Sequence, residues 1–122
     1  MTILLVDDEA AIRQHARSIL QAHGYRVLEA SGGMAAMHIC QQHEGPIHLL
    51  LTDVLMPEIN GQILGEHVTA LRPCIRVLYM SGATSDALIA LFDRTRSRAL
   101  IQKPFTPDVL VRKVRGLLSA VR

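Results

Sequence analysis

The feature that most constrains the fold of this chain is an apolar run, Leu49–Leu51, that contains no polar alternation. Such a run is typical of a β-strand that is covered on both faces, as in the parallel sheets of α/β proteins. It leads into a single carboxylate, Asp53, after which Pro57, Asn60 and Gly61 turn the chain. Asp53 is therefore expected at the carboxyl end of a central strand, where open α/β sheets form ligand sites. Taken alone, this stretch favours a simpler interpretation over a ligand site: Asp53 ends the strand and only caps the following loop.

The rest of the chain alternates short apolar runs with stretches of helical spacing. The expected strands are Ile3–Val6, Tyr25–Glu29, the stretch ending at Asp53, Ile75–Tyr79 and Ala99–Ile101. A helix is expected after each strand, and the second helix should turn inward Met34, Met37, His38 and Cys40. The fourth helix is the short apolar segment Ala87–Phe92. Five strand–helix units with short connections predict one α/β domain, residues 1–122, built on a doubly wound five-stranded parallel sheet.

Composition excludes several classes of protein. Hydrophobic residues make up 49% of the chain and charged residues 20%, which argues against disorder. The net charge of +2 and the lack of a Lys/Arg run argue against direct binding of nucleic acid. No apolar stretch approaches the roughly 18 residues of a membrane span, and no signal peptide is recognised. Cys40 and Cys74 are far apart and are expected to be buried, reduced thiols, which favours a cytoplasmic protein.

Several polar residues follow the expected strands. Because the carboxyl ends of parallel strands meet at one edge of a sheet, we expect Asp7, Asp8, Asp53, Ser81 and Lys103 to converge. Two like charges 4 Å apart repel by about 4 kcal/mol at an effective dielectric of 20, and a hard divalent cation such as Mg²⁺ relieves this. A phosphoryl group then fits, with Lys103 as a charge, Ser81 as a donor and Asp53 as the attacking carboxylate.

Each of these residues also has a simpler interpretation. Asp7 and Glu9 fit a cap of the first helix about as well as a metal site. Ser81 fits the cap of a turn, and Lys103 fits a solvated surface position. Their joint placement at one edge of one sheet favours a functional site over separate and unrelated structural roles for these residues.

The motifs at this edge resemble those of receiver domains of two-component response regulators, most closely the receivers of hybrid sensor kinases. The resemblance covers the whole chain and rests on Leu5-Val-Asp7-Asp8-Glu9, Asp53-x-x-Met56-Pro57 with Gly61, Met80-Ser81-Gly82 and Lys103-Pro104-Phe105, in the order of the family. It implies a flavodoxin-like sheet with strand order 2-1-3-4-5 and a cis peptide bond between Lys103 and Pro104.

The resemblance also implies a chemistry for these residues. Asp53 would accept a phosphoryl group from a histidine kinase or phosphotransfer protein. Asp8, Asp53 and the Leu55 carbonyl would bind Mg²⁺ directly and Asp7 would bind it through water. Ser81 and Lys103 would contact the phosphoryl oxygens. Such a domain catalyses its own phosphorylation and dephosphorylation and is not an enzyme that acts on a separate substrate.

Two positions depart from the family pattern. Leu100 stands where the family often has an aromatic switch residue, and Ala83 stands where some members carry a polar residue near the attacking water.

Two other functions compete with this interpretation. A haloacid-dehalogenase-like phosphatase would need a second Asp at position 55, which is Leu. A phosphate-independent interaction domain is disfavoured because nothing required for phosphorylation is missing. Contact with a partner or a second copy is considered for residues 84–122, with simple burial as the default.

Overall fold

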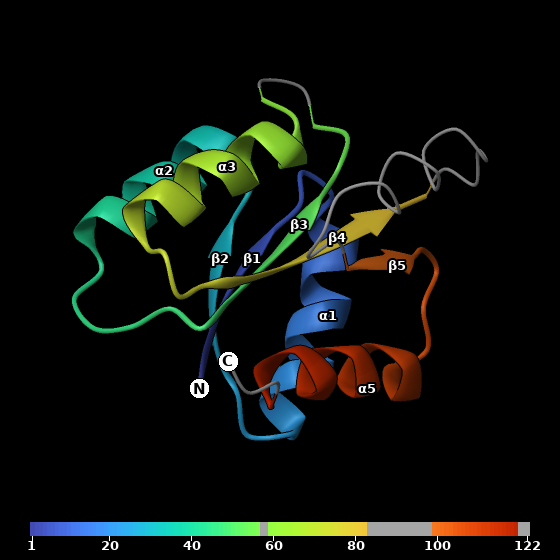
Figure 1. Ribbon diagram of the computed structural model, residues 1–122. Helices are drawn as coiled ribbons and strands as arrows, with labels where there is room; N and C mark the ends of the chain where they lie inside the picture. Colours follow the sequence, from blue (N-terminus) through green and yellow to red (C-terminus); the bar gives the residue numbers. More distant parts are fainter. Residues whose placement is uncertain (57–58, 83–98, 120–122) are drawn as a thin grey trace.

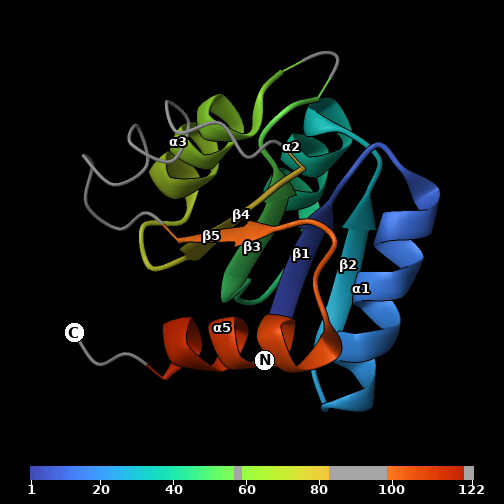
Figure 2. The same ribbon diagram turned by 90° about the vertical axis from the view of Figure 1, so that its right-hand side faces the viewer.

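The computed structural model, which describes residues 1–56, 59–82 and 99–119, is a twisted parallel sheet between two layers of helices (Figures 1 and 2). The described elements, in chain order, are β1 (Thr2–Val6), α1 (Ala10–Ala22), β2 (Arg26–Ala30), α2 (Gly33–Gln42), β3 (Leu49–Asp53), α3 (Gly61–Leu71), β4 (Arg76–Ser81), β5 (Leu100–Gln102) and α5 (Pro107–Leu118). The strands are ordered β2-β1-β3-β4-β5, and every described pairing is parallel. The predicted doubly wound sheet and its strand order are confirmed.

Strands β1 and β3 form the centre of the sheet, and every residue of both is buried. Leu4 of β1 lies between Leu28 of β2 and Leu50 of β3, so apolar side chains meet across three strands. Strand β2 lies at the edge and is only partly buried, which explains its mixed sequence. The uninterrupted apolar runs are therefore the signature of strands with helices on both faces.

Alternate residues of the central strands enter two separate apolar clusters. Ile3 and Leu49 pack with Leu20 of α1 and Leu110 of α5 on one face of the sheet. Leu4 and Leu50 belong to the cluster on the other face, which contains Cys40 of α2 and Val68 of α3. Figure 2 shows α2 and α3 together on one side of the sheet and α1 and α5 on the other. Because the described pairings are all parallel, the carboxyl ends of the five strands lie along one edge of the sheet.

Three local signals fix helix boundaries close to the predicted positions. Gly24 follows the C-cap residue of α1 and adopts a φ of +90°, a conformation that glycine accepts without strain. The Asn60 side chain accepts a hydrogen bond from the Ile63 amide at 2.9 Å and caps α3. Thr106 caps α5 in the same way by accepting from the Val109 amide at 3.3 Å.

Several expectations about burial were wrong. Gly33, Ala36 and Cys40 are the buried residues of α2, so Met34, which is 68% exposed, and His38 lie on the outer side of the helix. Cys74 is exposed because it lies in the turn between α3 and β4 and not within either element. The predicted fourth helix, Ala87–Phe92, lies outside the described residues.

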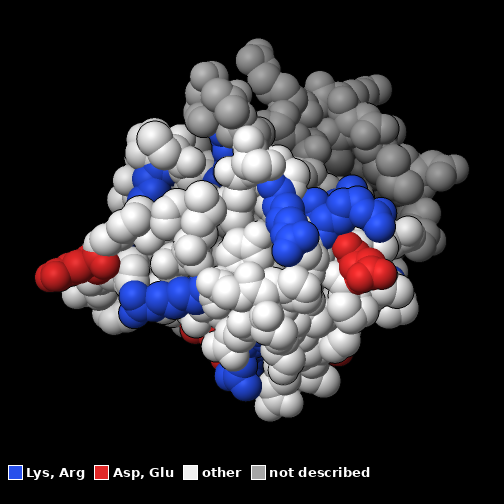
Figure 3. All heavy atoms as spheres, turned by 90° about the horizontal axis from the view of Figure 1, so that it is seen from below, with Lys and Arg blue, Asp and Glu red and all other residues white. Residues whose placement is uncertain are grey.

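Charged side chains are dispersed on the face that is seen from below in Figure 1. Lys and Arg residues there are interspersed with acidic and uncharged ones (Figure 3). Within the described part of the chain, no helix combines the length and the apolar character that crossing a membrane requires.

Candidate functional site

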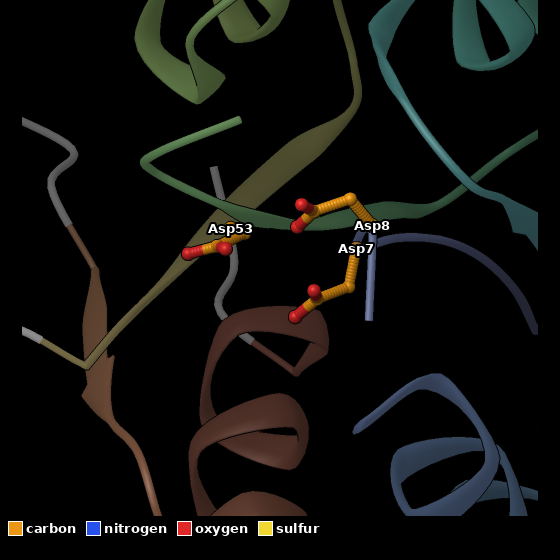
Figure 4. A group of neighbouring side chains, drawn as sticks. All are labelled: Asp7, Asp8 and Asp53. Atoms are coloured by element: carbon orange, nitrogen blue, oxygen red, sulfur yellow. The ribbon is translucent and has the colours of Figure 1, made fainter. Parts of the chain in front are cut away.

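Three carboxylates converge where strands β1 and β3 end. Asp7 and Asp8 follow β1 directly, and Asp53 is the last residue of β3. One carboxylate oxygen of each lies within 4.8 Å of the others, and in Figure 4 the side chains of Asp7 and Asp8 extend toward the side on which Asp53 lies. Asp7 and Asp53 are buried, whereas Asp8 is exposed. The predicted convergence of the acidic residues is thus present, with an opening to solvent at Asp8.

Lys103 reaches this cluster from the loop that follows β5. Its ammonium nitrogen lies 3.0 Å from Oδ2 of Asp7 and 3.3 Å from Oδ2 of Asp53. Its backbone amide donates to the Ser81 carbonyl at 2.8 Å, which ties the loop to the end of β4. The peptide bond between Lys103 and Pro104 is cis, as the family resemblance implied. Lys103 therefore contacts two of the three clustered carboxylates and is not a solvated surface residue.

Burial and charge shift the pKa values of this group in ways that follow from the geometry. Burial raises the pKa of the Asp53 carboxyl, and although Lys103 lowers it, the neighbouring Asp7 raises it further, so the balance remains upward. Burial alone would lower the pKa of the Lys103 ammonium, but the hydrogen bond and charge of Asp7, together with Asp53, raise it overall. The lysine is therefore held in its charged form between two carboxylates.

Asp7 is fixed at each of its polar groups. Its amide donates to the Ala30 carbonyl at 3.3 Å, and its Oδ1 accepts from the Glu9 amide at 2.9 Å. Its carbonyl accepts a hydrogen bond from Arg13 of α1 at 2.7 Å. Asp7 therefore both supports the start of α1 and faces the cluster. Glu9 occupies the N-cap of α1 without a capping hydrogen bond from its side chain, so the capping interpretation does not hold for Glu9.

The other residues singled out from the sequence lie at the ends of β3, β4 and β5 or in the loops that follow. Ser81 ends β4 and is buried beside β5, where it pairs with Gln102. Leu55 lies two residues after Asp53, and its side chain is 66% exposed. Leu100 is partly buried and packs against the small cluster of Val54 and Tyr79. Ala83 lies outside the described residues.

The residues present fit a hard divalent cation. Three carboxylates in such close contact carry more negative charge than the single Lys103 ammonium offsets. Carboxylate oxygens with room for water are the ligands that Mg²⁺ prefers. Asp8, Asp53 and Asp7 are the described residues that could hold the ion, and the Leu55 carbonyl lies on the loop beside them.

Two contacts beside the acidic cluster were not predicted from the sequence. Gly61 was singled out as a turn residue and as part of the Asp53 motif, but not for its close approach to Asp53: a Cβ at this position would lie 2.2 Å from the Asp53 carbonyl oxygen. Arg13 was not singled out at all, although it contacts Asp7. The spacing of Arg13 and Arg17, one helical turn apart, was the available signal, but it also fits an ordinary solvated face of a helix.

The sequence and the structure of this chain are similar to those of known proteins. Residues 3–115 match the family described as the response regulator receiver domain. The chain is 32% identical over 118 residues to the sensor kinase CckA of Brucella abortus (strain 2308), covering 97% of this chain but 12% of the kinase. It is also 32% identical over 118 residues to the response regulator receiver protein CpdR of the same organism, covering 97% of each. The crystal structure of the receiver domain from the hybrid histidine kinase CckA superposes with a TM-score of 0.83 at 32% identity, covering 98% of this chain and 100% of that one.

Proposed function

Because this chain belongs to the response regulator receiver domain family, we propose that it is the phosphoacceptor of a two-component phosphorelay, with Asp53 as the residue that is phosphorylated. The observation that carries the proposal is the convergence of Asp7, Asp8 and Asp53 on Lys103 at the carboxyl edge of the sheet. The donor is a phosphohistidine of a sensor histidine kinase or of a phosphotransfer protein, and the reaction takes place in the cytoplasm.

In the proposed transfer, a carboxylate oxygen of Asp53 attacks phosphorus. The new phosphorus–oxygen bond forms as the phosphorus–nitrogen bond to the donor imidazole breaks, and the electron pair of that bond stays on the imidazole nitrogen. Lys103 exchanges its contact with Asp53 for a phosphoryl oxygen, and the Ser81 hydroxyl donates to another. Positioning and charge stabilisation do most of the work, because phosphoryl transfer leaves the protein little covalent chemistry to perform.

We propose that the acidic cluster holds Mg²⁺, with Asp8 and Asp53 as direct ligands together with the Leu55 carbonyl, and Asp7 as a ligand through water. When bound, the ion would withdraw charge from the phosphoryl oxygens. The chain itself supplies the rigid ends of β1 and β3 and a buried environment in which these charges interact strongly.

The partners that we propose are proteins. The phosphoryl donor meets the open side of the site at Asp8 and Leu55, both of which are exposed. Contact with a second copy or a downstream partner is proposed for residues 84–122, of which the described part includes α5. Since this chain covers 12% of one curated relative and 97% of another, both a segment of a larger kinase and a separate regulator are consistent with the proposal.

The proposal is tested by labelling the purified chain with acetyl phosphate or with a phosphorylated kinase in the presence of Mg²⁺. Asp53→Asn should abolish the labelling, detected as the mass of one phosphoryl group. Asp108→Asn is the matched control, because Asp108 is an exposed carboxylate in the first turn of α5 and should label as the wild type does. Labelling of Asp53→Asn at the wild-type level would refute the assignment.

A further inference from the structure

Arg13 of α1 joins the backbone beside the acidic cluster to strand β2. Its Nη1 donates to the carbonyl oxygen of Asp7 at 2.7 Å, and its Nε lies 3.6 Å from Oε1 of Glu29. The side chain is 20% exposed, so it lies largely beneath the protein surface. One guanidinium therefore bridges the backbone at the end of β1 and a carboxylate on β2.

Glu29 is itself held in place from two directions. The parallel pairing of β1 with β2 puts it opposite Leu5, two residues before Asp7. Arg17, one helical turn after Arg13, makes an ion pair with the other carboxylate oxygen, Oε2. The planar fork of Arg13 thus has a fixed partner at one end and the Asp7 carbonyl at the other.

The Asp7 carbonyl belongs to the peptide group that links Asp7 to Asp8. Because a peptide group is planar, a hydrogen bond to this oxygen fixes the orientation of the whole unit and with it the direction in which the Asp8 side chain leaves the backbone. The Asp8 side chain is exposed, and among the described residues its carboxylate makes no hydrogen bond or ion pair. Its direction therefore depends on the backbone that Arg13 holds.

We infer that Arg13 is a positioning residue for the two acidic residues after β1, and that Glu29 in turn orients Arg13. This inference rests on the proposed function, since it assigns Arg13 to the metal site proposed there. Partners that orient metal ligands without touching the metal commonly contribute about 10- to 100-fold to affinity. Arg13 contributes in this manner through the backbone and not through a contact with the ion.

Charge alone predicts the opposite result, which makes the inference testable. Removing a positive side chain near an acidic cluster strengthens the binding of a cation if only Coulomb interactions matter. Loss of positioning weakens it. Arg13→Met should therefore raise the Kd for Mg²⁺ about tenfold, whereas a purely electrostatic role for Arg13 would lower the Kd.

The experiment measures the Kd for Mg²⁺ by following the amide resonances of Asp8 and Glu9 during titration of the unphosphorylated protein. Arg17→Met is the matched control, because it removes the same charge and an ion pair with the same Glu29 but no hydrogen bond to Asp7. It should change the Kd far less than Arg13→Met. The double variant Arg13→Met/Glu29→Gln leaves the local net charge unchanged and should bind as weakly as Arg13→Met.

Arg13→Lys provides a second route if Arg13→Met does not fold, as judged by the dispersion of its amide spectrum. It keeps the charge but lacks the fork, so its Kd should lie between those of the wild type and Arg13→Met. A Kd for Arg13→Met equal to or lower than that of the wild type, or equal to that of Arg17→Met, would overturn the inference. Failure of the wild-type protein to bind Mg²⁺ would instead refute the metal site of the proposed function.

Discussion

Asp53 loses most of its contact with water on folding, and this burial raises the pKa of its carboxyl above the ordinary value of 3.8 in spite of the nearby Lys103. A raised pKa means that the folded state holds the proton more tightly than the unfolded chain does. Below the unfolded pKa the group is protonated in both states and carries no penalty. As the pH rises through the folded pKa, the penalty for keeping a buried charge develops in full.

Removing this charge should therefore stabilise the fold at neutral pH. We expect Asp53→Asn in the absence of Mg²⁺ to unfold at a higher urea concentration than the wild type at pH 7, and the difference should shrink as the pH falls toward 4. Urea unfolding at both pH values measures this. Glu44→Gln, which neutralises an exposed carboxylate, serves as the control and should show little change. A less stable Asp53→Asn at pH 7 would mean that pairing with Lys103 outweighs the cost of burial.

The junction between β3 and α3 depends on the absence of a side chain at Gly61. The Gly61 amide donates to the Val54 carbonyl at 2.8 Å, so the two segments approach closely. A Cβ on Gly61 would lie 2.2 Å from the carbonyl oxygen of Asp53 and 3.1 Å from Cα of Val54. These are backbone atoms and cannot rotate away, so an added methyl group must displace the segment that carries Asp53.

We expect Gly61→Ala to destabilise the domain by about 1–3 kcal/mol, as is typical of overpacking, and to slow phosphorylation. Gly116 in α5 offers a matched control, because a Cβ there would meet no atom within 4 Å. Gly116→Ala should stabilise the domain by about 0.5–1 kcal/mol, because glycine is unfavourable within a helix. Denaturant unfolding of the two variants decides the matter, and stabilisation by both substitutions would show that the backbone at Asp53 yields easily.

Helices α2 and α3 are joined at their carboxyl ends by Arg72. Its guanidinium donates to the carbonyl groups of Cys40 at 3.1 and 3.3 Å, His43 at 2.7 Å and Gly45 at 2.8 Å. These carbonyls lie in the last turn of α2 and in the loop after it, where a helix lacks internal donors. The residue that follows α3 thus supplies donors to the end of a neighbouring helix.

Arg72→Met should lower the free energy of unfolding by about 2 kcal/mol, since hydrogen bonds from a charged group are worth roughly 1.5–3 kcal/mol and this side chain is only partly buried. Arg112→Met, on the exposed side of α5, is the control for loss of a positive charge. Chemical denaturation gives both values. Hydrogen exchange at the end of α2 should accelerate in Arg72→Met, and equal losses in the two variants would assign the effect to charge alone.

For the whole molecule, the sequence was most informative where topology leaves few choices. Runs such as Leu49–Leu51 required a sheet covered on both faces, and parallel strands require that Asp7, Asp53 and Lys103 meet at one edge. The convergence of these residues could therefore be predicted without knowing any side-chain conformation. The direction of Met34, in contrast, depended on which stripe of α2 faces the sheet.

Contacts that depend on the reach of one long side chain could not be predicted in this way. Arg13 contacts Asp7 and Glu29 because of the register of β1 with β2 and the rotation of α1 about its axis. A local sequence pattern predicts neither the register nor the rotation. The close approach of Gly61 to Asp53 is equally a result of how the loop folds back. Exposure of Cys74 follows from the exact length of the turn before β4.

Transmission of the phosphorylated state across the molecule should be limited. Leu100 packs beside Tyr79 and Val54 and has neither a ring nor a hydroxyl that would interact differently in two states. A ligand shifts an equilibrium only through such a difference.

We expect beryllofluoride, a phosphoryl mimic, with Mg²⁺ to cause large amide chemical-shift changes near Asp53 and Ser81 and small ones along α5. Changes along α5 as large as those at the site would show that an effective switch operates with Leu100. Leu100→Tyr, measured in parallel, should enlarge the changes along α5.

The two ion pairs of Lys103 mean that the metal-free domain carries a tethered counter-ion. An amine on a short loop is present at a high effective concentration near the carboxylates. A divalent cation must therefore compete with the Lys103 ammonium for the carboxylate oxygens. Lys103→Met should therefore bind Mg²⁺ more tightly than the wild type while being phosphorylated more slowly, which titration and labelling can compare directly. Weaker Mg²⁺ binding by Lys103→Met would contradict this competition. Lys103 would then limit the affinity of the site for the metal. Once the metal had displaced its ammonium group from the carboxylates, that group would be available to bind the phosphoryl group.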